Sequence, residues 1–64
     1  MDMSNKELSD MIDMWIKGER NRAIMKRRLI DGIRFEPLAE EFELSVRHTK
    51  HIVYTNLQKL NEKK

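Results

Sequence analysis

Apolar residues recur with helical spacing in four segments of this chain of 64 residues. In the first segment they fall at i, i+3, i+4, i+7 and i+8, the pattern of an amphipathic helix, namely Leu8, Met11, Ile12, Trp15 and Ile16. Ser4 precedes this segment and Glu7 lies three residues further on, so the pair can form a capping box. Gly18 is expected to end or bend the helix, because glycine tolerates the left-handed conformation found after helix C-termini.

Two further helices are predicted between Gly18 and a turn at residues 43–45. The second segment surrounds its apolar residues with basic ones, and Asp31-Gly32 is a turn signal that ends it. Pro37 suits the first turn of the third helix, where the missing N–H of proline costs nothing. The apolar residues Leu38, Ala39 and Phe42 then follow helical spacing.

The fourth segment begins after Ser45, whose hydroxyl can accept a free backbone N–H of a first helical turn. Its inward positions keep helical spacing to the end of the segment, namely Val46, Thr49, Ile52, Val53, Leu57 and Leu60. Because the third and fourth helices are joined by so short a link, their apolar faces must pack at a steep angle. This arrangement is a helix-turn-helix.

The pattern therefore predicts one all-α domain over residues 1–64, a four-helix domain containing a helix-turn-helix. The predicted helices cover residues of about 4–17, 20–31, 35–42 and 45–61, and residues 4–18 form an N-terminal accessory helix. Residues 1–3 and 62–64 are expected to lie outside the helices. A chain this short buries a small share of its surface, so its stability should be marginal.

Charge is segregated along the chain although the net charge is only +2. Residues 1–19 carry −3, residues 20–34 carry +5, residues 35–43 carry −4 and residues 44–64 carry +4. Such segregation can turn a positive face toward phosphate in a nearly neutral molecule. The absence of cysteine excludes disulfides and thiolate zinc sites, and it fits a cytoplasmic protein. No apolar run reaches the length of a membrane span, so no membrane association is expected.

Several short motifs carry a family resemblance. They are LIDG at residues 29–32, LAEEF at residues 38–42, Leu44-Ser45, Arg47, Ile52 and Leu57-x-x-Leu60. With the basic helix before them, they make residues 20–61 resemble the promoter-reading region four of bacterial sigma factors. Small sigma-like regulators, including those carried by phages and prophages, are similar too. The resemblance implies that the helix after Ser45 is the recognition helix. The other sigma regions are not in this chain, so a promoter-melting sigma factor is not expected.

Two positions depart from the family pattern. The turn position that usually holds glycine is Glu43, where a left-handed backbone would cost about 1 kcal/mol. The inward position that usually holds Val or Ile is Thr49, whose hydroxyl needs a partner such as a carbonyl oxygen one turn back.

The exposed face of the fourth helix supplies the candidate base contacts. Arginine can donate two hydrogen bonds to guanine, and lysine can serve a base or a phosphate. We expect four residues on two successive turns to face the major groove: Arg47, His48, Lys50 and His51. The alternative is a solvated helix face. Five more residues are expected near phosphates: Arg27, Arg28, Arg34, Thr55 and Lys59. For basic residues of the second helix, ion pairs with Glu36, Glu40 or Glu41 are an equal alternative.

Other chemistry is predicted less readily. Met11, Met14 and Trp15 can belong to the core or form a protein interface, since methionine adapts to varied surfaces. Phe35, Leu44 and Tyr54 are candidates for partner contacts from the later helices. His48 and His51 are spaced for a metal, but no cysteine or third histidine is present, so no metal site is expected. Neither a cofactor nor catalysis is predicted, and we do not expect an enzyme.

The sequence predicts a sequence-specific DNA-binding transcription regulator of bacterial or phage type, with its recognition helix in the major groove. A single recognition helix reads few base pairs. Besides double-stranded DNA, the protein should therefore bind RNA polymerase or a second copy of itself to gain useful specificity. The alternative is a module of the same shape that binds RNA polymerase, a sigma factor or itself without DNA. The fold cannot choose between the two.

Overall fold

The computed structural model describes residues 4–62 and consists of four helices. They are α1 (Asn5–Trp15), α2 (Glu19–Leu29), α3 (Phe35–Glu41) and α4 (Val46–Glu62). The predicted all-α, four-helix class is confirmed. The predictions for residues 1–3, 63 and 64 lie outside the described residues. Glu62, expected to lie beyond the last helix, is its final residue.

The ends of the helices follow local signals, with small differences from the prediction. Ser4 and Glu7 form the predicted capping box at the start of α1. That helix ends at Trp15 and not at residue 17, because Ile16 already has an extended backbone. The Ile16 carbonyl oxygen accepts a hydrogen bond of 3.1 Å from Nη1 of Arg22. This bond holds the segment between α1 and α2 against the first turn of α2. Gly18, with φ of +89°, precedes α2 in a conformation that few other residues adopt.

The link between α3 and α4 has a left-handed residue within the predicted turn. Glu43 has φ of 57°. The Glu43 N–H donates to the Glu40 carbonyl oxygen at 3.1 Å, and the Leu44 N–H donates to the Ala39 carbonyl oxygen at 2.8 Å. This pair of bonds is the Schellman arrangement that closes helix C-termini. Ser45 Oγ then accepts the N–H of His48 at 3.0 Å, which caps the start of α4 as predicted.

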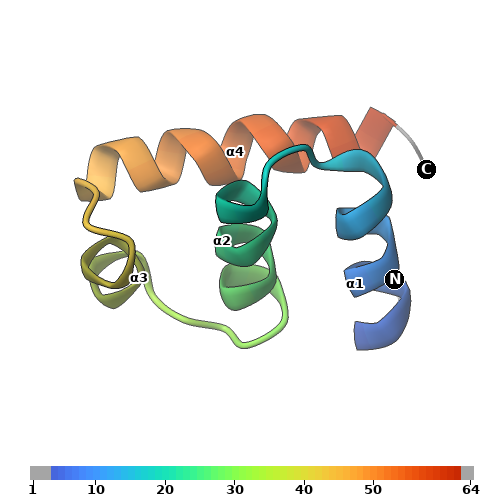
Figure 1. Cartoon of the computed structure of the whole chain (residues 1–64), viewed down its shortest axis with the longest axis horizontal. Helices are drawn as coiled ribbons and strands as arrows, with labels where there is room; N and C mark the ends of the chain where they lie inside the picture. Colours follow the sequence, from blue (N-terminus) through green and yellow to red (C-terminus); the bar gives the residue numbers. More distant parts are fainter. Residues whose placement is uncertain (1–3, 63–64) are drawn as a thin grey trace.

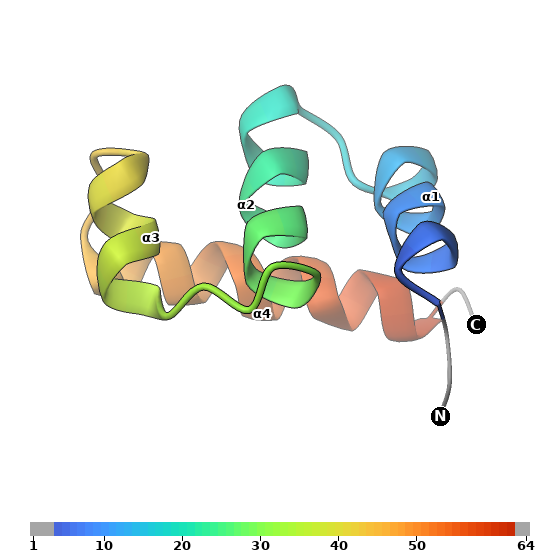
Figure 2. The same ribbon diagram turned by 90° about the horizontal axis from the view of Figure 1, so that it is seen from below.

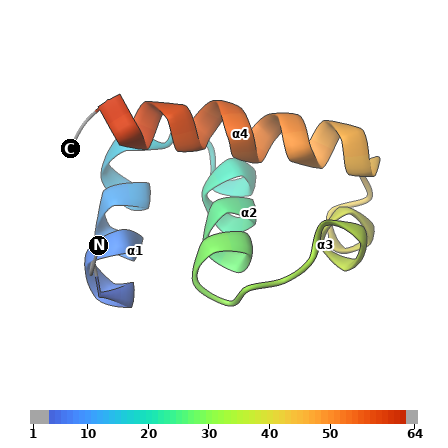
Figure 3. The ribbon, with the colours of Figure 1, turned by 180° about the vertical axis from the view of Figure 1, so that it is seen from behind.

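The long helix α4 spans the molecule, and the three shorter helices lie along one side of it (Figure 1). Figure 2, seen from the side of the short helices, shows α1, α2 and α3 each crossing α4. Both α2 and α4 contact all three of the other helices, whereas among the described residues α1 and α3 do not touch. Figure 3 shows the same order from behind, with α3 near the start of α4 and α1 near its end.

The core lies between α4 and the short helices and draws on all four elements. Its buried apolar residues are Ile12, Ile16, Ile24, Met25, Leu38, Ala39, Ile52, Val53 and Leu60. Two polar residues of α4 are buried with them, and each bonds a carbonyl oxygen one turn back. Thr49 Oγ1 donates to Ser45 at 2.9 Å, as predicted, and Asn56 Nδ2 donates to Ile52 at 2.8 Å. Each of the two side chains therefore donates a hydrogen bond to the backbone one turn earlier.

Replacing Glu43 with glycine should stabilise the domain by about 1 kcal/mol, because glycine has no Cβ to strain a left-handed backbone. For a domain of this size that corresponds to a rise in Tm of about 4–8 °C. Thermal unfolding followed by circular dichroism measures it. Glu40→Gly is the matched control, since this exposed residue lies inside α3 and glycine there should destabilise. A lower Tm for Glu43→Gly would contradict the left-handed turn.

Candidate functional site

The outward face of α4 is the largest concentration of the predicted site residues. The buried residues of α4 define the opposite, inward side of the helix, namely Thr49, Ile52, Val53, Asn56 and Leu60. At 3.6 residues per turn, the outward side of α4 carries a ridge that includes three residues spaced i, i+4 and i+7. These are Arg47, His51 and Tyr54, and all three are exposed. The helix therefore presents basic and aromatic groups along its solvent side.

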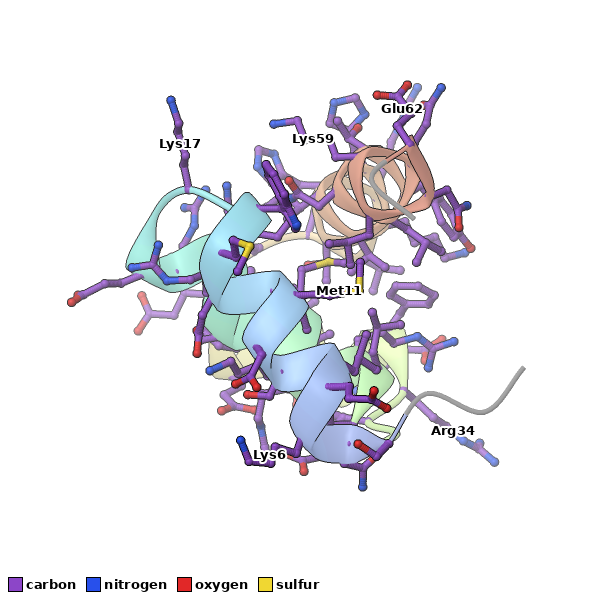
Figure 4. The ribbon with its side chains drawn as sticks, turned by 90° about the vertical axis from the view of Figure 1, so that its right-hand side faces the viewer. Lys6, Met11, Lys17, Arg34, Lys59 and Glu62 are labelled. Atoms are coloured by element: carbon purple, nitrogen blue, oxygen red, sulfur yellow. The ribbon has the colours of Figure 1, made fainter. Side chains whose placement is uncertain are left out.

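The remaining predicted residues of α4 lie on the two flanks of this ridge. Lys50 lies on the flank toward α3, where its ammonium group is 5.7 Å from the centre of the Phe35 ring. The helical spacing places His48, Thr55 and Lys59 together on the other flank, and all three are exposed. In Figure 4, Lys59 projects from the far side of α4 relative to Arg34. The predicted contacts on α4 therefore lie on the ridge and on both of its flanks.

Phe35, the first residue of α3, contacts side chains of both α2 and α4. The Arg28 guanidinium of α2 lies over its ring at 4.3 Å from the centroid. The Tyr54 ring of α4 meets it edge-on, with centroids 5.9 Å apart and planes at 66°. Nη1 of Arg28 also donates to the Ile33 carbonyl oxygen at 3.0 Å, so the arginine is held in place. Such cation–π and edge-to-face contacts are favourable geometries.

Sequence reasoning identified Phe35 and Tyr54 separately, as candidates for partner contacts, and did not place them together. They are 19 positions apart and on different helices, and no local pattern signals that they touch. The apolar spacing within each helix indicates only that neither ring belongs to the set of inward residues. The contact depends on the crossing of α3 and α4.

Arg27 and Arg28 were both predicted to contact phosphate, but their surroundings differ. Arg27 donates from Nε and Nη2 to Oε1 of Glu41 at 3.1 and 3.0 Å, and from Nη1 to Oδ2 of Asp31 at 3.0 Å. The hydrogen bond with Glu41, followed by that with Asp31, raises the pKa of Arg27 above its ordinary value. Its charge is thus balanced by two carboxylates, which is the ion-pair alternative left open by the sequence. Lys26 is likewise paired, with Asp13 of α1 at 2.8 Å.

Arg34 lies just before α3 and is exposed, and Figure 4 shows its side chain extending away from the helices. Together with Arg28 and Lys50 it places three cationic side chains around the Phe35 end of α3. Of the five predicted phosphate contacts, Arg28 and Arg34 therefore lie on the Lys50 flank of α4. Thr55 and Lys59 lie on the opposite flank, and Arg27 is engaged with acidic residues of α2 and α3.

The helix α1 divides its apolar residues between core and surface. Ile12 is buried and Met11 half-buried, and Figure 4 shows Met11 on the side of α1 toward α4. Met14 is 70% exposed and Trp15 is 41% exposed. The predicted interface set is thus split between helices, since Met14 and Trp15 lie on α1, whereas Tyr54 lies midway along α4 and contacts Phe35 of α3.

Within residues 4–62, no group of three or more His, Cys, Asp or Glu side chains is arranged to hold a metal ion. None of the helices in that range is long and apolar enough to cross a membrane. Comparison with protein-family models, with curated proteins and with solved structures found no match for this chain.

Proposed function

We propose that this protein is a sequence-specific DNA-binding transcription regulator in which α3, the turn at Glu43 and α4 act as a helix-turn-helix. The observation that carries the proposal is the exposed ridge of α4. Arg47 and His51 project from its first two turns, opposite a buried side that packs on α2 and α3. A helix presented in this way can enter the major groove, where the residues near its N-terminus reach base edges.

The distribution of charge supports the same proposal. Lys50, Arg28 and Arg34 gather beside the ridge, on the flank that faces α3. Cations beside a recognition helix would neutralise backbone phosphates and set the position of the protein on the duplex. One acidic residue of α3, Glu41, is paired with Arg27 and not with these three cations. The resemblance to region four of sigma factors favours action at promoters in a bacterial or phage-infected cytoplasm, with RNA polymerase or a second copy as partner.

The second candidate function is a protein-interaction module that does not use DNA. Exposure of Met14 and Trp15 on α1 favours it, because large apolar side chains at the surface suit contacts with proteins. The two candidates do not exclude each other in space, since α1 and the start of α4 lie at opposite ends of the molecule (Figure 1).

Salt dependence distinguishes the two functions. We expect the protein to bind mixed-sequence duplex DNA and to lose about tenfold or more in affinity between about 50 and 200 mM salt, because several phosphate counterions are released. Fluorescence anisotropy of a labelled duplex measures this directly. An apolar interface through α1 would respond little to salt. No DNA binding even at low salt would reject the proposed function and make α1 the place to seek a partner.

A further inference from the structure

We propose that Tyr54 is a base-contacting residue that reads the methyl group of a thymine in the major groove, with Phe35 as its positioning residue. This inference rests on the proposed DNA binding. It adds a specificity-determining residue to that site and gives it a defined ligand group.

The first argument is the position of Tyr54 on α4. It lies on the same ridge as Arg47 and His51, and its side chain is 57% exposed. Seven residues separate it from Arg47, which at 1.5 Å per residue is about 10 Å along the helix axis. That span fits within the length over which a helix lying in a major groove contacts a few successive base pairs. If Arg47 reaches bases, Tyr54 follows the same groove two turns later.

The second argument is that the ring of Tyr54 is held in place before any ligand arrives. Its edge-on contact with Phe35 fixes it against α3. Phe35 is fixed in turn by the Arg28 guanidinium at 4.3 Å, which is itself bonded to the Ile33 carbonyl oxygen. A tyrosine side chain has only two main torsions, so little conformational entropy remains to be lost on binding. An exposed ring positioned in this way is suited to recognition.

The third argument is the chemistry around the ring. The two charged groups stacked on Phe35 are both cations, Arg28 and Lys50, so this surface attracts a polyanion. Among the groups that bases expose in the major groove, the C5-methyl of thymine is the apolar one, and apolar side chains contact it. The exposed Tyr54 ring, next to a phenylalanine that carries two cations, thus matches a thymine flanked by phosphates. The phenol hydroxyl is not required for this contact.

The test removes the methyl group from the DNA. High-affinity duplexes are first selected from a random pool with the wild-type protein, and each thymine of the selected site is then replaced by deoxyuridine. We expect one replacement to weaken wild-type binding about fourfold, the effect of losing one buried methyl-sized group. Tyr54→Phe should keep this sensitivity because it keeps the ring. Tyr54→Ala should bind the thymine and uracil duplexes equally.

Phe35→Leu tests the positioning role. This variant should bind mixed-sequence DNA nearly as well as the wild type. The ratio of its affinities for the thymine and uracil duplexes should fall toward one, since the tyrosine ring is no longer held. Circular dichroism of each variant shows whether the helices are retained. An equal uracil penalty for the wild type and Tyr54→Ala would overturn the inference. So would loss of methyl sensitivity in Tyr54→Phe, or a selection that enriches no sequence. Absence of any binding to mixed-sequence DNA would instead refute the proposed function itself.

Discussion

Met25→Ala should destabilise the domain by about 3 kcal/mol, because it removes a fully buried side chain of α2 and leaves a cavity between the helices. Met25 belongs to α2, which packs against all three other helices, so the surrounding side chains cannot close the cavity by a shift of one element. A domain of this length has a total stability of about 3–10 kcal/mol. The variant should therefore be largely unfolded at temperatures where the wild type is folded. Urea unfolding followed by circular dichroism measures the difference.

The matched control is Met14→Ala, which makes the same chemical change at a residue that is 70% exposed. Its effect on stability should lie within about 0.5 kcal/mol, because little apolar surface is lost from the interior. A large destabilisation by Met14→Ala, or a negligible one by Met25→Ala, would contradict the packing of α1 and α2. Retained stability in Met14→Ala also makes it the variant with which to examine protein partners of α1.

Replacing Arg47, Lys50 and His51 together with alanine should reduce DNA affinity by about 100-fold or more. Two of these residues belong to the exposed ridge of α4 and the third to the flank beside Phe35. Base contacts are worth about 1–3 kcal/mol each, and loss of cationic groups also lowers the salt dependence. All three side chains are exposed, so the helices should remain intact. Anisotropy titrations at two salt concentrations give both the affinity and the slope.

The control for this variant removes the same number of Lys and Arg charges from the connection between α1 and α2, away from the exposed ridge of α4. Lys17→Ala with Arg20→Ala alters two exposed residues around the start of α2, distant from the beginning of α4. If DNA binding depends on α4, this control should retain most of its affinity. Equal losses in the two variants would show that binding follows net charge alone and not the ridge of α4.

The helices were predictable because their signals act within a turn or two of the chain. Ser4 and Ser45 cap helices at the expected positions, and apolar spacing identified the buried sides of α1 and α4. The resemblance to the sigma-factor family marked Glu43 as a turn position that usually holds glycine, and its backbone is left-handed in the structure. Boundaries moved by one or two residues; α1, for example, ends at Trp15 because Ile16 has an extended backbone.

The candidate site was predictable only as a set of exposed basic residues. The sequence could not decide which cations are balanced by acids, because that depends on partners from other helices. Arg27 and Arg28 are neighbours in the chain, yet Arg27 turns to Glu41 and Arg28 to Phe35. Successive residues on a helix point about 100° apart, so they meet different neighbours once the helices pack.

The sequence by itself determined four helices, the serine caps of α1 and α4, the place of the turn around Glu43 and a last helix with an exposed basic side. These properties depend on hydrogen bonds and apolar spacing within a few residues, and the local chain specifies them. Tertiary structure decided that Tyr54 rests against Phe35, that Lys50 lies over the same ring, and that Met14 stays outside the core. Those relations depend on the angle and register at which α1 and α3 cross α4, which no single segment of the chain contains.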